Sequence, residues 1–234
     1  MKQNDDNKYC VIIPAYREAQ RIGEVVTQVL KHISTVVVID DGSPDNTAEE
    51  AQKAGAIVLR HDVNKGKAAA LNTGFDYACK NGFHAVITLD GDGQHDPADI
   101  ARFVDAYNQT GFPVQIGNRM ADPRGMPLIR RLTNRFTSWL LSREMKQRVP
   151  DTQNGYRLYK CEILPRVWTE SSRFAAESEI LLKIADQGFR MGAVPIKTVY
   201  RDEESKVNPI KDSIGFFGVI ARHRKEKKRP AKTQ

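Results

Sequence analysis

Short, nearly continuous apolar runs alternate with longer amphipathic segments over the first half of the chain. Such runs are typical of buried β-strands, and they cover 9–13, 35–39, 56–59, 85–89 and 114–117. Between them, apolar residues recur every three or four positions, which predicts helices over 22–30, 44–54, 67–80 and 97–107. This alternation predicts an α/β fold with a mainly parallel sheet and helices on both faces.

The pattern changes after residue 118. Apolar residues at helical spacing predict an amphipathic helix over 128–140, and several arginines lie on the same segment. Further elements are predicted over 151–160, 177–187, 192–200 and from Pro209 onward. We expect a single domain over 1–221 that is followed by a flexible basic tail over 222–234.

Positive charge is concentrated at the end of the 234-residue chain. The net charge is +7, of which +6 belongs to 222–234 and +1 to 1–221. Such a basic segment suits an anionic membrane surface, where each Lys or Arg contributes about 1 kcal/mol. A disordered solubilising tail is the alternative. We expect no nucleic-acid partner, because the nearly neutral body lacks a basic groove with stacking aromatic residues.

Two features bear on the cellular location. Residues 1–8 are polar, and the longest late apolar run, 214–221, has eight residues where a membrane span needs about 20. We therefore expect neither a signal peptide nor a transmembrane helix. Cys10, Cys79 and Cys161 are far apart and odd in number, which is typical of reduced thiols. The sequence favours a cytoplasmic protein.

An acidic turn, Leu89-Asp90-Gly91-Asp92-Gly93-Gln94-His95, follows the fourth predicted strand. Asp90, Asp92 and Gln94 are spaced two residues apart, so in an extended segment their oxygens can converge on one hard cation. Solvated turns share this composition. The polar clusters 14–18 and 40–41 follow two other strands, and the carboxyl ends of parallel strands form the ligand-binding edge of such a sheet. We expect the three clusters to meet there.

Four stretches of the chain together resemble the inverting glycosyltransferases of family 2. They are Pro14-Ala15-Tyr16-Arg17-Glu18, Val38-Ile39-Asp40-Asp41-Gly42-Ser43-Pro44-Asp45, Asn64-Lys65-Gly66-Lys67-Ala68 and 89–95. The resemblance covers about 9–205 and is greatest toward the dolichyl- or polyprenyl-phosphate mannosyltransferase branch. It implies a GT-A fold with a nucleotide-binding half over 9–118 and an acceptor half over 119–221. It also implies a nucleotide-sugar donor and a divalent cation, Mg²⁺ or Mn²⁺.

The resemblance also implies the residues of the donor site. Asp92 is the main metal ligand and a catalytic residue, with Asp90 and Gln94 as the other metal ligands. The implied nucleotide-sugar-binding residues are Pro14, Ala15, Tyr16, Glu18, Ile39, Asp41, Lys67, Asp90, Gly91, Asp92, Arg201 and Lys206. Ordinary turn chemistry for Asp41 and ordinary packing for Tyr16 are the alternatives. Arg17 stands where the family usually has Asn.

Basic residues of the second half resemble the family's acceptor side. Gly117-Asn118-Arg119 is similar to its Gly-Ser/Thr-Arg motif, and Asp151 to Tyr159 is similar to a stretch that supports the acceptor. Arginine forks bind phosphate in a bidentate manner. By resemblance, the phosphate of a polyprenyl-phosphate acceptor would be held by Arg119 and Arg130 as catalytic residues and by Arg131 and Arg135. A solvated helix face is the alternative.

The acceptor determines whether a general base is needed. A phosphate is already anionic at neutral pH, whereas a hydroxyl acceptor needs a base, for which Asp151 is the candidate. A hydroxyl group of a polysaccharide, glycolipid or protein therefore stays possible as the acceptor. Two other functions also stay possible, a metal-dependent nucleotidyltransferase and a non-catalytic module that binds nucleotide sugars. The sugar, the base (guanine or uracil) and the oligomeric state are open. We expect peripheral membrane contact at the cytoplasmic face through the helix over 128–140 and the basic tail.

Overall fold

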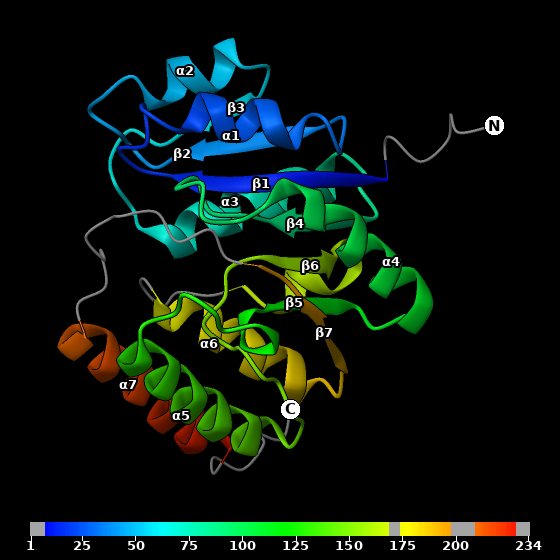
Figure 1. Ribbon diagram of the computed structural model, residues 1–234, viewed down its shortest axis with the longest axis vertical. Helices are drawn as coiled ribbons and strands as arrows, with labels where there is room; N and C mark the ends of the chain where they lie inside the picture. The colour runs from blue at the N-terminus through cyan, green and yellow to red at the C-terminus, as the bar shows by residue number, and fades with distance from the viewer. Residues whose placement is uncertain (1–7, 169–173, 198–208, 228–234) are drawn as a thin grey trace, which may run out of the picture.

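The computed structural model describes residues 8–168, 174–197 and 209–227, which form one seven-stranded sheet (Figure 1). The strand order is β3-β2-β1-β4-β6-β5-β7. Adjacent strands run parallel, except that β6 is antiparallel to both β4 and β5. The strands are β1 (Tyr9–Ala15), β2 (Val36–Asp40), β3 (Ile57–Arg60), β4 (Ala85–Thr88), β5 (Val114–Asn118), β6 (Arg157–Lys160) and β7 (Met191–Pro195). The predicted α/β class is confirmed.

Helices cover both faces of the sheet. The α-helices are α1 (Ile22–Val29), α2 (Thr47–Lys53), α3 (Lys67–Lys80), α4 (Ile100–Thr110), α5 (Leu128–Met145), α6 (Phe174–Asp186) and α7 (Pro209–Lys227). Short 3-10 helices are η1 (Pro97–Asp99), η2 (Arg119–Ala121) and η3 (Cys161–Arg166). One face of the sheet packs against α1, α2 and α4, and the other against α3, η3 and α6. In Figure 1, α5 and α7 lie together at the bottom, outside this second layer.

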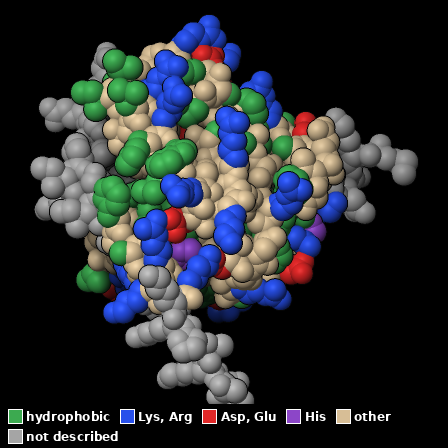
Figure 2. All heavy atoms as spheres, turned by 90° about the horizontal axis from the view of Figure 1, so that it is seen from below, with side chains coloured by type: hydrophobic (Ala, Val, Ile, Leu, Met, Phe, Trp, Pro, Cys, Tyr) green, Lys and Arg blue, Asp and Glu red, His purple; other side chains and the backbone are tan. Residues whose placement is uncertain are grey.

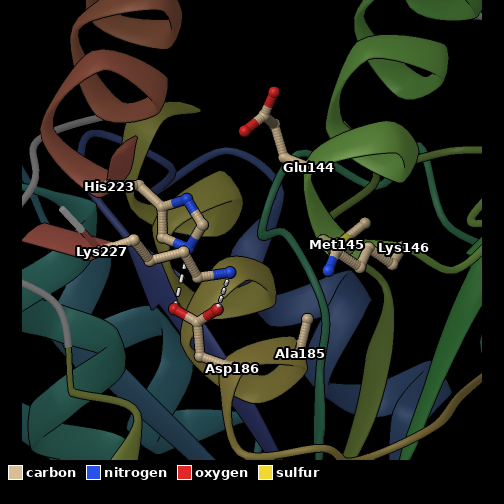
Figure 3. A pocket seen from close by; sticks show the side chains of 7 residues that line it. All are labelled: Glu144, Met145, Lys146, Ala185, Asp186, His223 and Lys227. Carbon is tan, nitrogen blue, oxygen red and sulfur yellow. Dashed lines mark hydrogen bonds and ion pairs between the residues drawn. The ribbon is translucent and has the colours of Figure 1, made fainter. Parts of the chain in front are cut away.

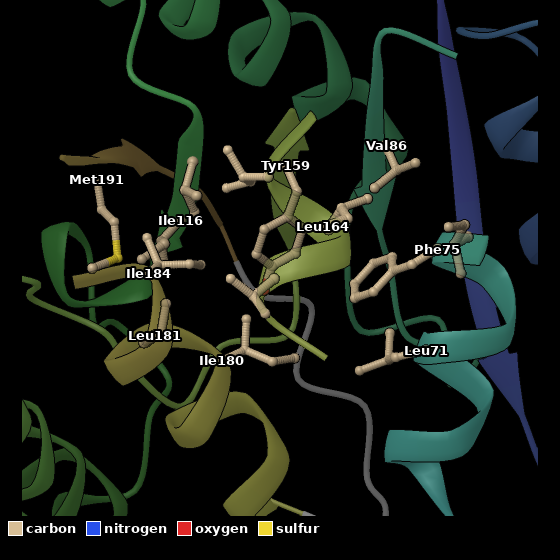
Figure 4. Close-up of a cluster of buried hydrophobic side chains, with 14 of the residues drawn as sticks. Leu71, Phe75, Val86, Ile116, Tyr159, Leu164, Ile180, Leu181, Ile184 and Met191 are labelled. Atoms are coloured by element: carbon tan, nitrogen blue, oxygen red, sulfur yellow. The ribbon is translucent and has the colours of Figure 1, made fainter. Parts of the chain in front are cut away.

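Alternate strand residues point to opposite faces and so build two cores. In β1, Ile12 belongs to the core under α3 and α6, whereas Val11 and Ile13 belong to the core under α1 and α4. Figure 4 shows the first core, in which Phe75 of α3 meets Tyr159 of β6 edge-on, with ring centroids 5.5 Å apart. The strands are therefore buried on both faces, as their continuous apolar runs predict.

The carboxyl ends of the parallel strands meet at one edge of the sheet. Ala15 at the end of β1 is in register with Asp40 at the end of β2, and the N–H of Leu89, just after β4, donates to the Ile12 carbonyl at 3.1 Å. A Cβ added to Gly91 would lie 3.6 Å from the Glu18 side chain. The three polar clusters therefore share this edge, as predicted from the sequence.

Several predicted boundaries differ from the structure, and two of these differences concern the edge of the sheet and the basic tail. The helix predicted from Pro44 begins at Thr47, because Ser43 is held in a turn in which its N–H donates to Asp40 Oδ1 and its Oγ accepts from the Arg17 N–H, both at 3.0 Å. The predicted flexible tail starts inside a helix, since α7 continues to Lys227. Residues 228–234 lie outside the described residues. None of the helices described is long and apolar enough to cross a membrane.

Candidate functional site

A chain of alternating charges lies beneath the acidic turn that follows β4. Lys67, in the first turn of α3, places its Nζ 2.6 Å from Asp90 Oδ1 and 2.7 Å from Glu177 Oε1. Glu177, in the first turn of α6, is nearly fully buried, whereas Asp90 keeps 31% of its side chain exposed. Lys67 therefore ties α3, α6 and the end of β4 together at the carboxyl edge.

The two acidic residues of the turn differ in how easily they ionise. Burial opposes ionisation of Asp90, yet the Lys67 ammonium and the His95 ring hold the pKa of that carboxyl well below its usual range. The pKa of Asp92 is raised, first by burial and then by the negative charge of Asp90. A raised pKa beside an ionised carboxylate marks a place where added positive charge is favourable.

The oxygen atoms of this turn fit a hard divalent cation whose remaining ligands come from a substrate. Within 8–168, 174–197 and 209–227, no three His, Cys, Asp or Glu side chains form a group that could hold a metal ion by themselves. Mg²⁺ is commonly bound through one or two carboxylates, with phosphates and water as the remaining ligands. Asp90 and Asp92 match that pattern. Gln94 lies on the same turn, which is closed by its N–H donating to Asp92 Oδ1 at 2.9 Å.

Gly155 and Arg157 lie beside this chain of charges and, like Glu177 and His95, were not among the predicted site residues. A Cβ added to Gly155 would lie 2.9 Å from Glu177 Oε1, 3.0 Å from Asp90 Oδ2 and 3.1 Å from Lys67 Nζ. Arg157 is fully buried and donates to the carbonyls of Thr152 at 2.8 Å and Asn154 at 2.6 Å. Arg157 also lies 3.5 Å from Glu177 Oε2. Only the resemblance of the 151–159 stretch could have indicated either residue.

Gly155→Ala is expected to weaken cation binding about tenfold, in the range typical of residues that orient metal ligands. The new methyl group has no space unless Asp90, Lys67 or Glu177 moves. Electron paramagnetic resonance titration with Mn²⁺ measures the affinity. Gly218→Ala is the control, because nothing lies within 4 Å of a Cβ at that position. Equal Mn²⁺ affinity of Gly155→Ala and the wild type would contradict the assigned packing.

Asp41 organises the loop beside the acidic turn. Its Oδ1 lies 2.7 Å from His61 Nδ1 and accepts from the Lys65 N–H at 2.9 Å, and its Oδ2 accepts from the Gly66 N–H at 2.7 Å. His61 Nε2 in turn lies 2.9 Å from Thr73 Oγ1. Asp41 therefore anchors the 61–66 loop in this structure. Its predicted role in binding the nucleotide sugar stays a prediction.

The remaining predicted donor-side residues divide into exposed and buried ones. Tyr16 follows β1, is 38% exposed and stacks under the Arg17 guanidinium at 5.2 Å. Glu18 is buried, and its N–H donates to Thr47 Oγ1 at 3.0 Å. The side chain of Ile39 is fully buried in the core under α3, so its role in nucleotide-sugar binding stays a prediction that only its backbone could fulfil. Pro14 and Ala15 form the end of β1.

Arg119 is held by an internal partner. Its Nε donates to Asp151 Oδ2 at 2.7 Å and its Nη2 donates to Asp151 Oδ1 at 2.9 Å. Asn134 of α5 also donates to Asp151 Oδ1 at 2.9 Å, and Asp151 is fully buried. Burial opposes ionisation of Asp151, but Arg119 lowers the pKa of its carboxyl. In this structure the two side chains neutralise each other. The roles of Arg119 in phosphate binding and of Asp151 as a base stay predictions.

The other predicted acceptor-side arginines are Arg130, Arg131 and Arg135 of α5. In the described part of the chain, no hydrogen bond or ion pair holds the side chains of Arg130, Arg131 or Arg135. Arg130 and Arg131 lie half-buried in the first turn of α5, and Arg135 is exposed one turn further on. These three guanidinium groups are available to an anionic ligand. Arg201 and Lys206 lie outside the described residues.

Residues 10–168 match the model of the family described as "Glycosyl transferase family 2". The chain is 31% identical over 235 residues to the UDP-N-acetylglucosamine--dolichyl-phosphate N-acetylglucosaminyltransferase of Methanococcus voltae, a match that covers 90% of this chain and 93% of the relative. It is 28% identical over 210 residues to the polyprenol monophosphomannose synthase of Mycolicibacterium smegmatis, a match that covers 82% of this chain and 77% of the relative.

One solved structure with the same fold is the glucosyl-3-phosphoglycerate synthase from Mycobacterium tuberculosis in complex with Mn²⁺, uridine diphosphate and glucosyl-3-phosphoglycerate. The TM-score is 0.71 at 18% sequence identity, and the match covers 97% of this chain and 82% of that chain. The shared architecture is a GT-A fold, as the sequence predicts.

Proposed function

Because the chain belongs to glycosyl transferase family 2, we propose that it transfers a hexose-type sugar from a nucleoside-diphosphate sugar to a polyprenyl phosphate. The name of one relative specifies dolichyl phosphate as the acceptor, and the name of another specifies polyprenol monophosphomannose as the product. Membership of the family makes the protein a glycosyltransferase. The proposal adds a hexose-type sugar, a polyprenyl-phosphate acceptor and a requirement for a divalent metal ion.

The observation that carries the proposal is the acidic pair at the carboxyl edge. Asp90 and Asp92 lie where ligands of parallel sheets bind, beside the loop anchored by Asp41. A divalent cation held by Asp90 and Asp92 supplies, when bound, positive charge that neutralises the leaving nucleoside diphosphate. The M. tuberculosis structure with Mn²⁺ and uridine diphosphate supports such a requirement in this fold.

The chain's own residues favour a phosphate as the acceptor. A phosphate needs no general base, and Asp151, the candidate base for a hydroxyl, is buried and paired with Arg119. The guanidinium groups of Arg130 and Arg131 orient the acceptor phosphate and hold its charge near the sugar. Attack from the face opposite the nucleotide inverts the anomeric centre. Lys67 and Glu177 keep Asp90 in position during this step.

Replacing both Arg130 and Arg131 with Ala is expected to raise the KM for polyprenyl phosphate by about tenfold or more, because charge-assisted bonds of this kind contribute about 1.5–3 kcal/mol each. The KM for the nucleotide sugar should stay within about twofold of the wild-type value, because surface substitutions away from a binding site usually have small effects. Arg148→Ala, which removes an exposed arginine beyond α5, is the matched control. Steady-state kinetics with each substrate varied in turn gives both constants. A double variant with an unchanged acceptor KM would contradict the assignment of these two arginines.

A pair of acceptors tests the proposed reaction class. Polyprenyl phosphate and the free polyprenol are each incubated with GDP-mannose, UDP-glucose or UDP-N-acetylglucosamine in Mn²⁺. We expect transfer from one donor to the phosphate only. Transfer to the free alcohol would instead assign the enzyme to hydroxyl acceptors. All three cysteines are free thiols, which supports the cytoplasmic location proposed for this reaction.

A further inference from the structure

The helix α5 is turned with its polar face inward. Asn134, Thr137 and Ser138 are buried, and Ser138 Oγ lies 3.1 Å from Thr152 Oγ1. Asn134 donates to the buried Asp151. Surface helices normally bury their apolar stripe and expose their polar one. Hydrogen bonds therefore fix the inner side of α5 over its first three turns, and the apolar residues of these turns are left on the outer side. Nearer the end of the helix, Leu141 and Met145 are buried in the core.

The outer face of α5 is a continuous apolar stripe. Its members recur every three to four residues, so they share one side of the helix. They are Leu128, Ile129, Leu132, Phe136 and Trp139, with exposed fractions of 68%, 81%, 57%, 52% and 57%. The rings of Phe136 and Trp139 contact each other, with centroids 6.2 Å apart. Contiguous exposed apolar side chains mark an interaction surface, since scattered ones alone are ordinary.

Positive charge surrounds this stripe. Within α5, four arginines accompany a single acidic residue, Glu144. Arg131 and Arg135 lie one residue before Leu132 and Phe136, and Arg143 follows Trp139 by four residues. Figure 2 shows the underside of the molecule, where hydrophobic side chains gather in patches with Lys and Arg side chains between them. An apolar stripe with Trp and Phe, flanked by arginines, is the pattern of helices that lie in an anionic membrane interface.

We propose that the outer face of α5 docks into the surface of an anionic lipid bilayer. The apolar side chains enter the boundary between headgroups and acyl chains, and the arginines contact lipid phosphates. This inference rests on the proposed function, since a polyprenyl phosphate is itself held in a bilayer. Docking brings Arg130 and Arg131, in the first turn of the same helix, to the level of the acceptor's phosphate.

The basic end of α7 is engaged with the protein itself. In Figure 3, His223 and Lys227 both point to Asp186 of α6, at 2.8 Å and 2.5 Å. Arg224 pairs with Glu144 of α5. The hollow between α5, α6 and α7 thus carries charges of both signs, which offset one another. Three of the side chains at this described end of α7 are thus occupied within the protein, and we therefore assign docking to α5.

The first test measures binding to vesicles that contain phosphatidylcholine and phosphatidylglycerol but no polyprenyl phosphate. The double variant Leu132→Ser/Phe136→Ser is expected to lower the partition coefficient by about tenfold or more, because interfacial binding scales with buried apolar area. Both side chains are more than half exposed, so the melting temperature should stay close to that of the wild type. Ile57→Ser, which removes an exposed apolar side chain from β3, is the matched control and should sediment as the wild type does.

A second test locates the contact directly. The chain has two tryptophans, so Trp168→Phe leaves Trp139 as the only one. We expect brominated lipids to quench the Trp139 fluorescence and its emission maximum to shift to shorter wavelength. Unquenched fluorescence at saturating vesicles would overturn the proposal. So would wild-type sedimentation of the double variant.

The remaining outcomes distinguish bilayer docking from dimerisation and from a loss of catalysis. A vesicle-free dimer that the double variant abolishes, seen by analytical ultracentrifugation, would replace the bilayer by a second copy of this chain. A water-soluble short-chain polyprenyl phosphate separates docking from catalysis. We expect the double variant to glycosylate it at the wild-type rate while losing activity on vesicle-bound acceptor. If the wild type itself fails with both acceptors but binds vesicles, the proposed function fails and the docking surface stands.

Discussion

Asp92→Asn is expected to reduce sugar transfer by roughly a thousandfold, the scale found when a preorganised group that stabilises transition-state charge is removed. Asparagine keeps the size of the side chain but removes the negative charge beside Asp90. The pair can then no longer hold a divalent cation against the leaving diphosphate. Transfer rates at saturating donor and acceptor measure the loss.

The matched control for this substitution is Asp105→Asn, which makes the same chemical change on an exposed position of α4. It should leave the transfer rate unchanged. Asp92→Asn should also fold normally, since the hydrogen bond that Asp92 accepts from the Gln94 N–H lies within its own turn. The expected loss is roughly a thousandfold. If Asp92→Asn instead transfers sugar at a rate within about threefold of the wild type, the assignment of Asp92 as a metal ligand is contradicted.

Asp151→Ala is expected to lower the free energy of unfolding by about 3–5 kcal/mol, the usual cost of removing one partner from a buried ion pair. The substitution leaves the Arg119 guanidinium buried without its carboxylate and removes the acceptor of the Asn134 amide. Urea unfolding at neutral pH measures the difference. Asp122→Ala, which breaks the exposed ion pair with Arg124, should leave the free energy of unfolding nearly unchanged.

The same ion pair predicts how this difference depends on pH. Arg119 lowers the pKa of Asp151 in the folded state, so the carboxylate binds its proton more weakly there than in the unfolded chain. The resulting stability is fully present above the unfolded pKa, about 3.9, and is lost as the pH falls through the folded value. The difference in the free energy of unfolding between the wild type and Asp151→Ala should therefore become smaller only below about pH 4. A gap that already narrows near neutral pH would contradict the direction of the shift.

The parallel part of the fold could be predicted because its signal is local. The runs that became β1, β2 and β4 are buried on both faces and therefore read as continuous apolar segments. That Asp41 and Asp90 meet at one edge then follows from the shared direction of these strands. The position of β6 could not be predicted in this way. It inserts antiparallel between β4 and β5, and this pairing depends on residues about 70 positions apart.

The orientation of α5 shows what periodicity cannot determine. The spacing of Leu132, Phe136 and Trp139 predicted an amphipathic helix correctly, but periodicity does not say which face is buried. Here Asn134 and Ser138 bond to buried partners at 151 and 152, so the polar face turns inward. The pairing of Arg119 with Asp151 could not be predicted for a related reason, since the two residues are 32 positions apart in the chain.

The part of the candidate site that lies in one short motif could be predicted, whereas the part that depends on contacts between distant residues could not. Asp90 and Asp92 lie in one short motif, so their proximity is visible in the sequence. The support of Asp90 by Lys67 and Glu177 joins α3 to α6 and requires the folded chain. Gly155 carries no local signal for its role, because the space that it leaves is filled by atoms of three distant residues.

Mass-spectrometric detection of a glycosyl polyprenyl phosphate is the most direct test of the proposed reaction. The purified protein is incubated with polyprenyl phosphate and the three nucleotide sugars, in Mn²⁺ or in excess EDTA. We predict a single product, a sugar joined to the lipid through one phosphate, that forms in Mn²⁺ and is absent in EDTA. Release of nucleoside diphosphate with no glycosylated lipid in either condition would contradict the proposed acceptor.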